Sequence, residues 1–406
     1  MQDDFADLIP RFDLRGMDLQ LDRMQAALRA MGSPCGSIPA IQVAGTNGKG
    51  SIACFLASAL QKAGIRTGLT ISPHLVSWCE RIRVDGQQIS PARLRQRLIA
   101  LQEISRLHRL TPFEQLLATS FAHFDDERVE LMVLEVGLGG RLDATTAHPL
   151  RPVIAMAAIG LDHCEHLGGT VTAIAREKAA VITAGSSVVS AQQSPDVAAV
   201  LEATCRDRSA SLHWVEPLSG DWPLGLPGRI QRSNAAVARG ALHALAQHGW
   251  QLNDATIRQG FAEASWMGRL QTVFWKGRPV RLDGAHNPPA AVQLAQERLA
   301  WPGQELGIPW ILAIQAHKQA TAMLQVLLQP QDQVWIVPVP DHPSWTRSQL
   351  VQSNPGWNDR IHPCDDVETA LEDIFKTSSW TQPLPVIAGS LYLLGDLFRR
   401  NLVTAE

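Results

Sequence analysis

The sequence predicts an α/β protein in which mostly parallel sheets are covered by helices on both faces. Short apolar runs rich in β-branched residues alternate with longer amphipathic segments, which is typical of parallel strands joined by helical crossovers. The length of 406 residues is sufficient for two to three domains of about 150 residues each. Hydrophobic residues make up 45% of the chain and charged residues 18%, a balance that suits a globular protein and excludes a disordered one.

The N-terminal elements follow one another as strand and helix. Residues 41–44 form a short apolar run before a glycine-rich turn, and the helix after that turn ends at Gly64. Strands are predicted here at residues 41–44, 65–71, 131–136 and 153–159. Helices are predicted at residues 51–63, 91–107, 111–124, 170–183 and 233–248, with Pro112 in the first turn of its helix.

A second series of strands and helices begins after a change in composition near residues 266–278. Its strands are predicted at residues 280–282, 310–314, 333–337 and 386–388, with a helix that starts at Pro288 and a loop rich in Pro, His and Trp. The chain is therefore predicted to form a larger N-terminal domain, residues 1–270, and a smaller C-terminal α/β domain, residues 277–406.

Charge and apolar content exclude several classes of function. The net charge is −3, and no run of Lys and Arg marks a nucleic-acid or anionic-membrane binder. The longest apolar runs, such as residues 153–161, are too short to span a bilayer, and the acidic N-terminus lacks the apolar core of a signal peptide. The 6 cysteines are scattered without a CxxC pair, which predicts reduced thiols and a cytoplasmic protein.

The strongest functional signal is the stretch from Val43 to Ser51, VAGTNGKGS, between a predicted strand and a predicted helix. Backbone N–H groups of such a turn and the N-terminus of the helix cradle a polyphosphate, while a lysine reaches the outer phosphates. Lys49 fits that role, and lysine is scarce among the 36 basic residues of the chain. The spacing departs from the strict GxxxxGK[ST] pattern, so a plain glycine-rich turn with an exposed lysine is the alternative.

Two further strand ends carry groups that could hold a metal ion. Glu135 ends a predicted strand, at the edge where parallel sheets bind ligands, and its carboxylate is a hard oxygen ligand suited to a metal that bridges phosphates. Asp162 and His163 follow the next strand in the same way. The alternatives are a carboxylate that caps the glycine turn and a histidine that serves only as a hydrogen-bonding residue.

Lys178 and the segment DGAHNP each allow two interpretations. Lys178 is either a solvated lysine on a helix or a neutral amine that takes up CO2 and becomes a carbamate, which arginine could not do. In DGAHNP, Asp283 and His286 stand on a strand–helix turn from which they could reach reacting groups. The alternative is helix capping by Asn287, with Pro288 at the first helical position, and both interpretations can hold together.

Taken together, these motifs resemble the folylpolyglutamate synthase/dihydrofolate synthase family of the Mur ligase superfamily. The resemblance covers nearly the whole chain in the right order. It rests on GTNGKGS (45–51), SPHL (72–75), ERI (80–82), EVGLGGRLDA (135–144), LDH (161–163), EKA (177–179), DGAHNP (283–288) and GSLYL (389–393). It implies a P-loop-type N-terminal domain with a mostly parallel sheet and a smaller, Rossmann-like C-terminal domain.

The resemblance implies amide formation driven by ATP. A carboxylate, either of dihydropteroate or of a folate's glutamate, would attack ATP to give an acyl phosphate and ADP. The amine of L-glutamate would then attack the acyl carbon and release phosphate. Catalysis of this kind depends on positioning and on charge neutralisation by Mg2+ and cationic groups.

The resemblance also implies the residues of the site. The ATP-binding residues would be Thr46, Asn47, Gly48, Lys49, Gly50, Ser51, Asn234, Arg269 and Asp283. Two Mg2+ ions would be held by Ser72, Glu135 and His163, and the catalytic residues would be Lys49, His286 and a carbamylated Lys178. The pterin would be bound by Leu19, Gln20, Leu21, Asp22, Thr111, Pro112, Phe113, Glu114, Leu142, Asp143 and Ala144, and the incoming glutamate by Arg81 and Ser390.

Three departures from the family pattern concern the substrate side. The usual DATN ends here with Thr146 in place of asparagine. The threonine that often follows Phe113-Glu114 by three or four positions is missing, and Thr119 comes one position later. The segment that usually resembles DKD reads His317-Lys318-Gln319, so both acids are gone.

The leading hypothesis is a cytoplasmic ligase, expected to act as a monomer, that binds ATP, Mg2+, dihydropteroate, folates and L-glutamate, but neither nucleic acid nor membrane. The alternatives are a monofunctional member of the family and a Mur-type ligase for another carboxylate acceptor. An inactive nucleotide-binding regulator would have lost the phosphate and metal residues, which are all present. A kinase would have no use for the DGAHNP and GSLYL segments.

Overall fold

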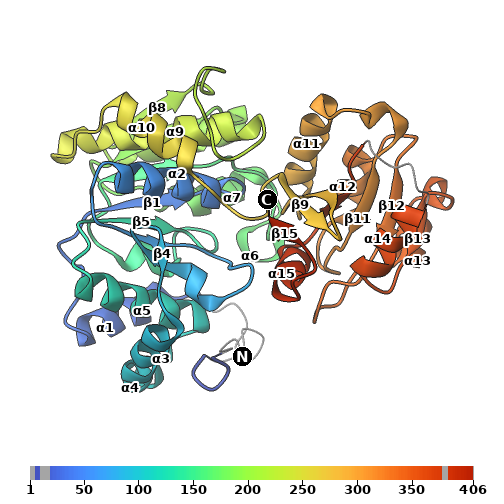
Figure 1. The fold of residues 1–406 in the computed structure, drawn as a ribbon. Helices are drawn as coiled ribbons and strands as arrows, with labels where there is room; N and C mark the ends of the chain where they lie inside the picture. The colour runs from blue at the N-terminus through green and yellow to red at the C-terminus, as the bar shows by residue number, and fades with distance from the viewer. Residues whose placement is uncertain (1–4, 10–18, 377–382, 406) are drawn as a thin grey trace. The chain divides into compact units, whose positions relative to one another are not determined.

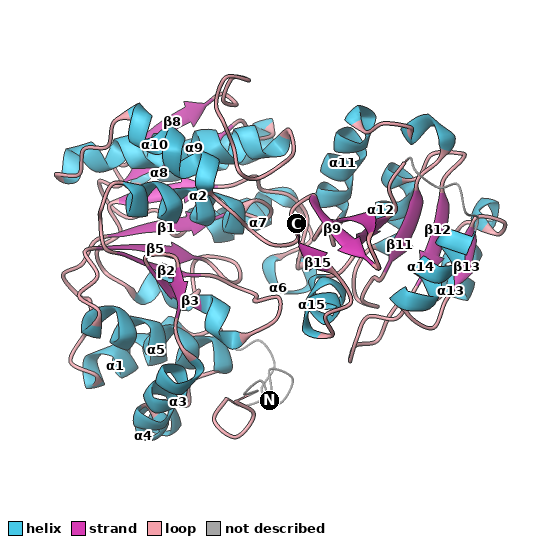
Figure 2. Ribbon diagram, viewed as in Figure 1, coloured by secondary structure: helices cyan, strands magenta, loops and turns pink. Residues whose placement is uncertain are grey.

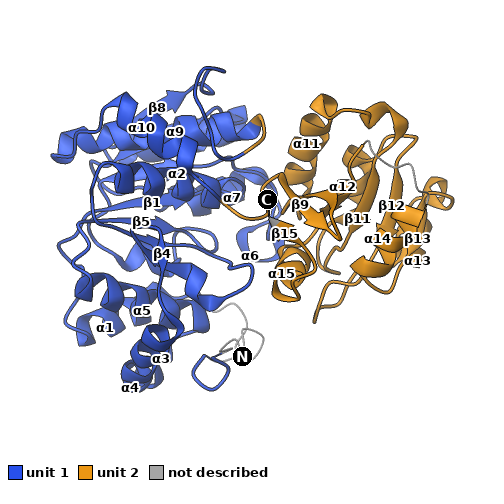
Figure 3. Ribbon diagram, in the orientation of Figure 1, with its two compact units in different colours: residues 1–226, 230–265 blue, residues 227–229, 266–406 orange. Residues whose placement is uncertain are grey.

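The computed structural model describes residues 5–9, 19–376 and 383–405, and the chain divides into two compact units (Figure 3). Unit 1 comprises residues 1–226 and 230–265, and unit 2 comprises residues 227–229 and 266–406. Each unit contains one sheet with helices packed on it (Figures 1 and 2), so the predicted α/β class with mostly parallel sheets is confirmed. The first four residues, part of the segment compared above with a signal peptide, lie outside the described residues.

Unit 1 is built on an eight-stranded sheet in the order β4-β3-β2-β5-β1-β6-β7-β8. Neighbours from β2 to β8 pair in parallel, and β3 and β4 are antiparallel at one edge. The strands are β1 (Ala40–Ala44), β2 (Thr67–Thr70), β3 (Ile82–Val84), β4 (Gln87–Gln88), β5 (Leu131–Glu135), β6 (Val153–Met156), β7 (Ser187–Ala191) and β8 (Ser211–Val215). The connection after β1 leads to β2 on one side of it, whereas the connection after β5 leads to β6 on its other side. The carboxyl end of β1 therefore lies at a topological switch point, where such sheets bind ligands.

The helices of unit 1 cover both faces of this sheet (Figure 2). Its helices are α1 (Leu21–Ala30), α2 (Lys49–Lys62), α3 (Pro91–Ala100), α4 (Gln102–Leu107), α5 (Pro112–Asp126), α6 (Cys164–Leu167), α7 (Val171–Ala179), α8 (Pro195–Asp207), α9 (Ile230–Ala244) and α10 (Asp254–Glu263). Helix α2 packs against α9 and α10. On the face that Ala40 and Ala44 share, apolar side chains form two separate clusters, one with α1 and α5 and one with α7 and α8.

Several predicted elements differ from the observed ones at their ends. The predicted helix 91–107 turns at Leu101, whose buried side chain joins the core beside Leu94 and Leu98, so it forms α3 and α4. The predicted strand 153–159 stops at Met156 because the following residues bend toward the turn after β1. The predicted helix 170–183 ends at Ala179, and the helix predicted from residue 233 begins at Ile230 and ends with a 3-10 turn, Leu245–His248.

Unit 2 contains a seven-stranded sheet in the order β13-β12-β11-β14-β10-β9-β15. The strands from β13 to β10 are parallel, whereas β9 is antiparallel to both of its neighbours. The strands are β9 (Gln271–Trp275), β10 (Arg278–Leu282), β11 (Pro309–Leu312), β12 (Gln333–Ile336), β13 (Ile361–Pro363), β14 (Val386–Ala388) and β15 (Thr404–Ala405). The helices are α11 (Pro288–Glu297), α12 (Ala320–Leu327), α13 (Arg347–Ser353), α14 (Val367–Lys376) and α15 (Leu391–Arg399).

A buried ion pair anchors the core of unit 2. Arg298 and Asp332 have side chains that are 1% and 0% exposed, and two guanidinium nitrogens of Arg298 donate to the two carboxylate oxygens. Asp332 also accepts hydrogen bonds from the backbone N–H of Ile308 (2.8 Å) and from the indole of Trp310 (3.2 Å). The pair therefore ties the strand β11 to the end of α11 and to the turn before β12.

None of the helices in the described ranges combines the length and the hydrophobicity that crossing a bilayer requires.

We expect Asp332→Ala to lower the free energy of unfolding by about 3–5 kcal/mol, because it leaves the Arg298 guanidinium buried and uncompensated. The measurement is urea unfolding of the full chain. The matched control is Glu372→Ala, which breaks the exposed pair with Lys276 and should cost at most about 1 kcal/mol. Equal losses in the two variants would contradict the structural role assigned to Asp332.

Candidate active site

The glycine-rich turn after β1 is held in a fixed conformation by the segment that follows β6. The Thr46 backbone N–H donates to the carbonyl of Ala158 (2.8 Å), and its hydroxyl donates to the carbonyl of Gly160 (3.0 Å). Gly45 and Gly48 have φ angles of 136° and 96°, which favour glycine at both positions. A Cβ on Gly45 would also collide with Ala157. Asn47 forms an isolated bridge with Ala158, and Gly50 and Ser51 are buried in the first turn of α2.

Two lysines converge on one carbonyl oxygen of this turn. Lys49 Nζ donates to the carbonyls of Gly45 (3.2 Å) and Thr46 (3.1 Å), and Lys178 Nζ donates to Gly45 (2.9 Å). The side chain of Lys178 comes from α7 and is buried. This burial, together with the charge of Lys49, lowers the pKa of Lys178 to about 7. Lys178 is therefore no solvated surface lysine, and its amine can be neutral near physiological pH.

Of the three predicted metal ligands, Glu135 and Ser72 contact each other, whereas His163 lies beside two other carboxylates. Glu135, at the end of β5 and buried, accepts a hydrogen bond from the backbone N–H of Ser72 (3.0 Å). His163 precedes α6 with a φ of 49°, and its ring nitrogens lie 3.8 Å from carboxylate oxygens of Asp162 and Glu165. No group of three or more His, Cys, Asp or Glu side chains in the described part of the chain could enclose a metal ion. The oxygen donors of Glu135 and Ser72 nevertheless suit a hard cation that takes its other ligands from phosphate and water.

The residues predicted to bind the pterin meet where α1, α5 and the loop after β5 contact one another. Thr111 and Glu114 form a capping box at the start of α5, with Pro112 in its first turn. Glu114 also accepts from Arg23 of α1 (2.8 Å). Leu21 and Asp22 form the first turn of α1, directly after Leu19 and Gln20. The ring of Phe113 packs against Gly137 so closely that a Cβ on Gly137 would lie 2.7 Å from it.

Asp143 holds its own loop together. Its carboxylate is buried and accepts hydrogen bonds from the backbone N–H groups of Gly137 (2.9 Å) and Leu138 (3.0 Å), as well as from Thr145. Burial raises its pKa, while these hydrogen bonds act in the opposite direction. Of its neighbours, Leu142 is 41% exposed and Ala144 is buried. Asp143 therefore fixes the shape of the loop, and the side chain of Leu142 is exposed on it.

Arg81 lies on the 3-10 turn Trp78–Arg81 between β2 and β3. Its Nε donates to Nδ1 of His74 (2.8 Å), and its guanidinium carbon lies 4.9 Å from the centre of the Trp78 ring. The arginine is therefore buried and oriented by two neighbours.

Asn234 contacts the glycine-rich turn from α9. A Cβ on Gly48 would collide with its Oδ1, and its Nδ2 donates to Oε1 of Gln231 (2.9 Å). The sequence predicts Asn234 at the start of its helix, whereas it lies in the second turn of α9. Gln231, which orients the amide, was missed because nothing in its local pattern distinguishes it from other polar helix residues.

In unit 2, Arg269, Asp283 and His286 gather around Gly284. Arg269 lies so close to Gly284 that a Cβ there would collide with its guanidinium. The carboxylate of the half-buried Asp283 accepts from the backbone N–H groups of Leu270 (3.0 Å) and Ala285 (2.9 Å). Desolvation raises its pKa, and the charge of Arg269 opposes this. Nδ1 of His286 lies 2.8 Å from the carbonyl of Gly284.

Two residues of unit 2 cap helices. Asn287 accepts from the backbone N–H of Ala290 (2.9 Å) at the start of α11, with Pro288 in the first turn, so the capping interpretation of DGAHNP is confirmed. Ser390 accepts from the backbone N–H of Tyr392 (3.1 Å) and is the N-cap of α15. Its hydroxyl is buried, and it follows β14 at the same sheet edge as Asp283 follows β10.

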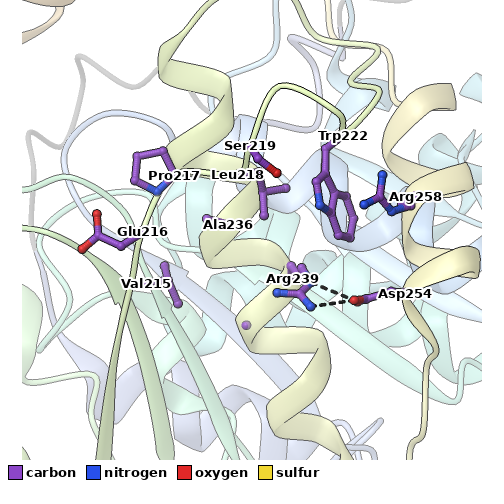
Figure 4. A pocket seen from close by; sticks show the side chains of 11 residues that line it. Val215, Glu216, Pro217, Leu218, Ser219, Trp222, Ala236, Arg239, Asp254 and Arg258 are labelled. Carbon is purple, nitrogen blue, oxygen red and sulfur yellow. Dashed lines mark hydrogen bonds and ion pairs between the residues drawn. The ribbon is translucent and has the colours of Figure 1, made fainter.

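Unit 1 also has an open cavity of about 590 Å³ beside β8, α9 and α10 (Figure 4). Trp222 lies there with the guanidinium carbons of Arg258 at 4.2 Å and Arg239 at 5.2 Å from its ring centre. Arg239 is paired with Asp254 (2.6 Å), as the dashed lines in Figure 4 mark. None of the predicted site residues lines this cavity.

Comparison with known proteins relates the chain to enzymes of folate metabolism. Residues 269–400 match the family described as dihydrofolate synthetase, C-terminal domain. The chain is 32% identical to a dihydrofolate synthetase of Saccharomyces cerevisiae, over 94% of this chain and 98% of that protein. It resembles the solved structure of E. coli FolC in complex with DHPP and ADP, with a TM-score of 0.83 and 26% identity over 98% of this chain and 95% of the other. It is also similar to a bifunctional folylpolyglutamate synthase/dihydrofolate synthase of Yersinia pestis complexed with AMPPNP and Mn ion, with a TM-score of 0.81 and 28% identity over 96% and 95% of the two chains.

We expect one lysine of the chain to titrate near pH 7, because burial of Lys178 disfavours its charged form. The measurement is NMR of protein labelled with 13C at lysine Cε, in which the chain's few lysines give few signals. The Lys178→Arg variant identifies the signal by its loss. A titration of every lysine above about pH 9.5 would contradict the proposed surroundings of Lys178.

Proposed function

Because the chain belongs to the dihydrofolate synthetase/folylpolyglutamate synthase family, we propose that it joins L-glutamate to 7,8-dihydropteroate and adds further glutamates to tetrahydrofolate. The observation that carries this proposal is the convergence of Lys49 and Lys178 on the turn after β1, with Glu135 and Ser72 paired at the end of the neighbouring strand β5. That arrangement suits transfer of a phosphoryl group from ATP to a carboxylate, since the reaction needs cations and hard oxygen ligands around the phosphates.

In the proposed reaction, a carboxylate oxygen of the acceptor attacks the γ-phosphorus, and the bond to the ADP oxygen breaks. The amine of glutamate then attacks the acyl carbon, loses a proton and expels inorganic phosphate, which leaves an amide. Thr46, Asn47, Gly48, Gly50 and Ser51 line the triphosphate, and Lys49 turns from the loop carbonyls to the outer phosphates.

We assign two Mg2+ sites, one to Ser72 and Glu135 and one to His163. Bound Mg2+ would neutralise phosphate charge. Lys178, as a carbamate formed from its neutral amine, would present an anion toward the second ion. The lowered pKa supports this assignment, because only the unprotonated amine reacts with CO2.

On the nucleotide side, Asn234 and the unit 2 residues Arg269 and Asp283 are proposed to contact ATP, and His286 to stand beside the reacting groups. The pterin is assigned to the set formed by the start of α1, the start of α5 and the loop 142–144. Glutamate carboxylates are assigned to Arg81 and Ser390. A cytoplasmic location and a monomeric state remain predictions.

A dedicated dihydrofolate synthetase is the second candidate. It is favoured by one observation, the similarity to the yeast dihydrofolate synthetase over nearly the full length of both chains.

We expect the purified protein with ATP, Mg2+ and L-glutamate to release phosphate when dihydropteroate or tetrahydrofolate is added, and to release little without an acceptor. The measurement is a coupled phosphate assay with each acceptor in turn, and with glutamate withheld as a control. Release with dihydropteroate alone would identify the dedicated enzyme. Release with neither acceptor would refute the folate assignment.

We expect Lys178→Arg to lower kcat by about 100-fold, because arginine keeps the charge but does not form a carbamate, while the Kd of an ATP analogue changes by less than about threefold. In wild-type protein freed of CO2, added bicarbonate should restore activity more fully at pH 8 than at pH 6, since the neutral fraction of Lys178 grows as pH rises through about 7. Full activity of Lys178→Arg would rule the carbamate out.

A further inference from the structure

A buried polar network crosses the sheet face between the two apolar clusters of unit 1. Gln42 lies on the central strand β1 and is fully buried. Its Nε2 donates to the hydroxyls of Thr145 (2.9 Å) and Thr146 (3.0 Å), and its Oε1 accepts from Arg151. Such a network is costly unless its members find partners, and these do.

The network reaches α7 from two directions. Arg151 Nη1 also donates to the carbonyl of Val181, just after α7 (2.9 Å). On the other side, the Thr146 hydroxyl donates to the carbonyl of Gly140 (2.8 Å), and the next residue, Arg141, donates its backbone N–H to the carbonyl of Glu177 on α7 (3.0 Å). The network thus brackets the end of the helix that carries Lys178.

Gly140 packs directly on the backbone of α7. A Cβ on Gly140 would lie 2.7 Å from the carbonyl oxygen of Glu177 and 3.1 Å from Cα of Lys178. Because this contact is between backbones, it transmits any displacement of the Gly140 turn to Lys178. The Lys178 amine in turn lies 2.9 Å from the carbonyl oxygen of Gly45, in the glycine-rich turn after β1.

We propose that Thr146 is a positioning residue for phosphoryl transfer. Its hydroxyl holds the Gly140–Arg141 turn against α7 and so fixes the point from which Lys178 reaches the glycine-rich turn after β1. The proposal rests on the proposed function for its kinetic consequence, but its geometric part does not. It also gives the departure from the family's usual asparagine a specific role, since Thr146 supplies one hydroxyl that both accepts from Gln42 and donates to Gly140.

The test uses Thr146→Val, which keeps the shape and removes the hydroxyl, and Thr146→Ser, which restores it. We expect Thr146→Val to lower kcat by about 5- to 20-fold with the KM for ATP within about twofold, because misplacement affects the reacting step more than binding. Thr146→Ser should return kcat to within about twofold of wild type. In the lysine-labelled protein, the Lys178 signal should shift in Thr146→Val while the other lysine signals remain in place.

A second variant and a matched control complete the design. Gly140→Ala should shift the same signal, because its Cβ displaces the backbone of α7. Thr204→Val removes a threonine hydroxyl whose hydrogen bond, within the described part of the chain, goes to a carbonyl of its own helix α8 (2.8 Å). This variant should leave kcat and the Lys178 signal unchanged.

The outcomes distinguish the positioning role of Thr146 from the proposed ligase function. An unmoved Lys178 signal in both Thr146→Val and Gly140→Ala overturns the positioning role, whatever the activity. A kcat of Thr146→Val within twofold of wild type overturns its kinetic consequence. A wild-type protein with no turnover refutes the proposed function, while the NMR comparison, which needs no turnover, still decides the positioning role.

Discussion

The glycine-rich turn of unit 1 depends on one constraint: the side-chain nitrogens of Lys49 and Lys178 both donate to the carbonyl oxygen of Gly45. Burial of Lys178 and the nearby charge of Lys49 both disfavour its protonated form and lower its pKa to about 7. The turn keeps its conformation because its backbone forms hydrogen bonds with the segment after β6. Lys178 keeps its position because hydrogen bonds hold Glu177 of α7 and Val181 just after this helix.

Much of the fold was predictable because its signals are local. The strand β1, the turn from Gly45 to Gly48 and the helix α2 follow from consecutive residues, and so does the cap formed by Asn287 and Pro288. Element ends were harder to predict, because distant contacts set them. The strand β6 stops at Met156 since the residues after it form hydrogen bonds with the glycine-rich turn after β1, more than a hundred positions earlier in the chain.

The candidate site shows the same division between local and distant causes. Motif resemblance pointed to Glu135 and Lys178, and the structure adds the pairing of Glu135 with Ser72 and the burial of Lys178. The motif resemblance did not indicate that the carboxylate of Asp143 accepts hydrogen bonds from backbone N–H groups, nor that Gln231 orients the amide of Asn234. Such roles depend on which group lies within hydrogen-bond distance across the fold, and a single sequence carries no record of that distance.

The two separate apolar clusters on one face of the unit 1 sheet have a consequence for local opening. Gln42 and Arg151 run between them, so the packing energy of the half with α1 and α5 is largely independent of the half with α7 and α8. The half with α1 and α5 can therefore loosen without releasing the helix that carries Lys178. Hydrogen exchange would then resolve one face of a single sheet into two zones of protection, with the polar network as the boundary.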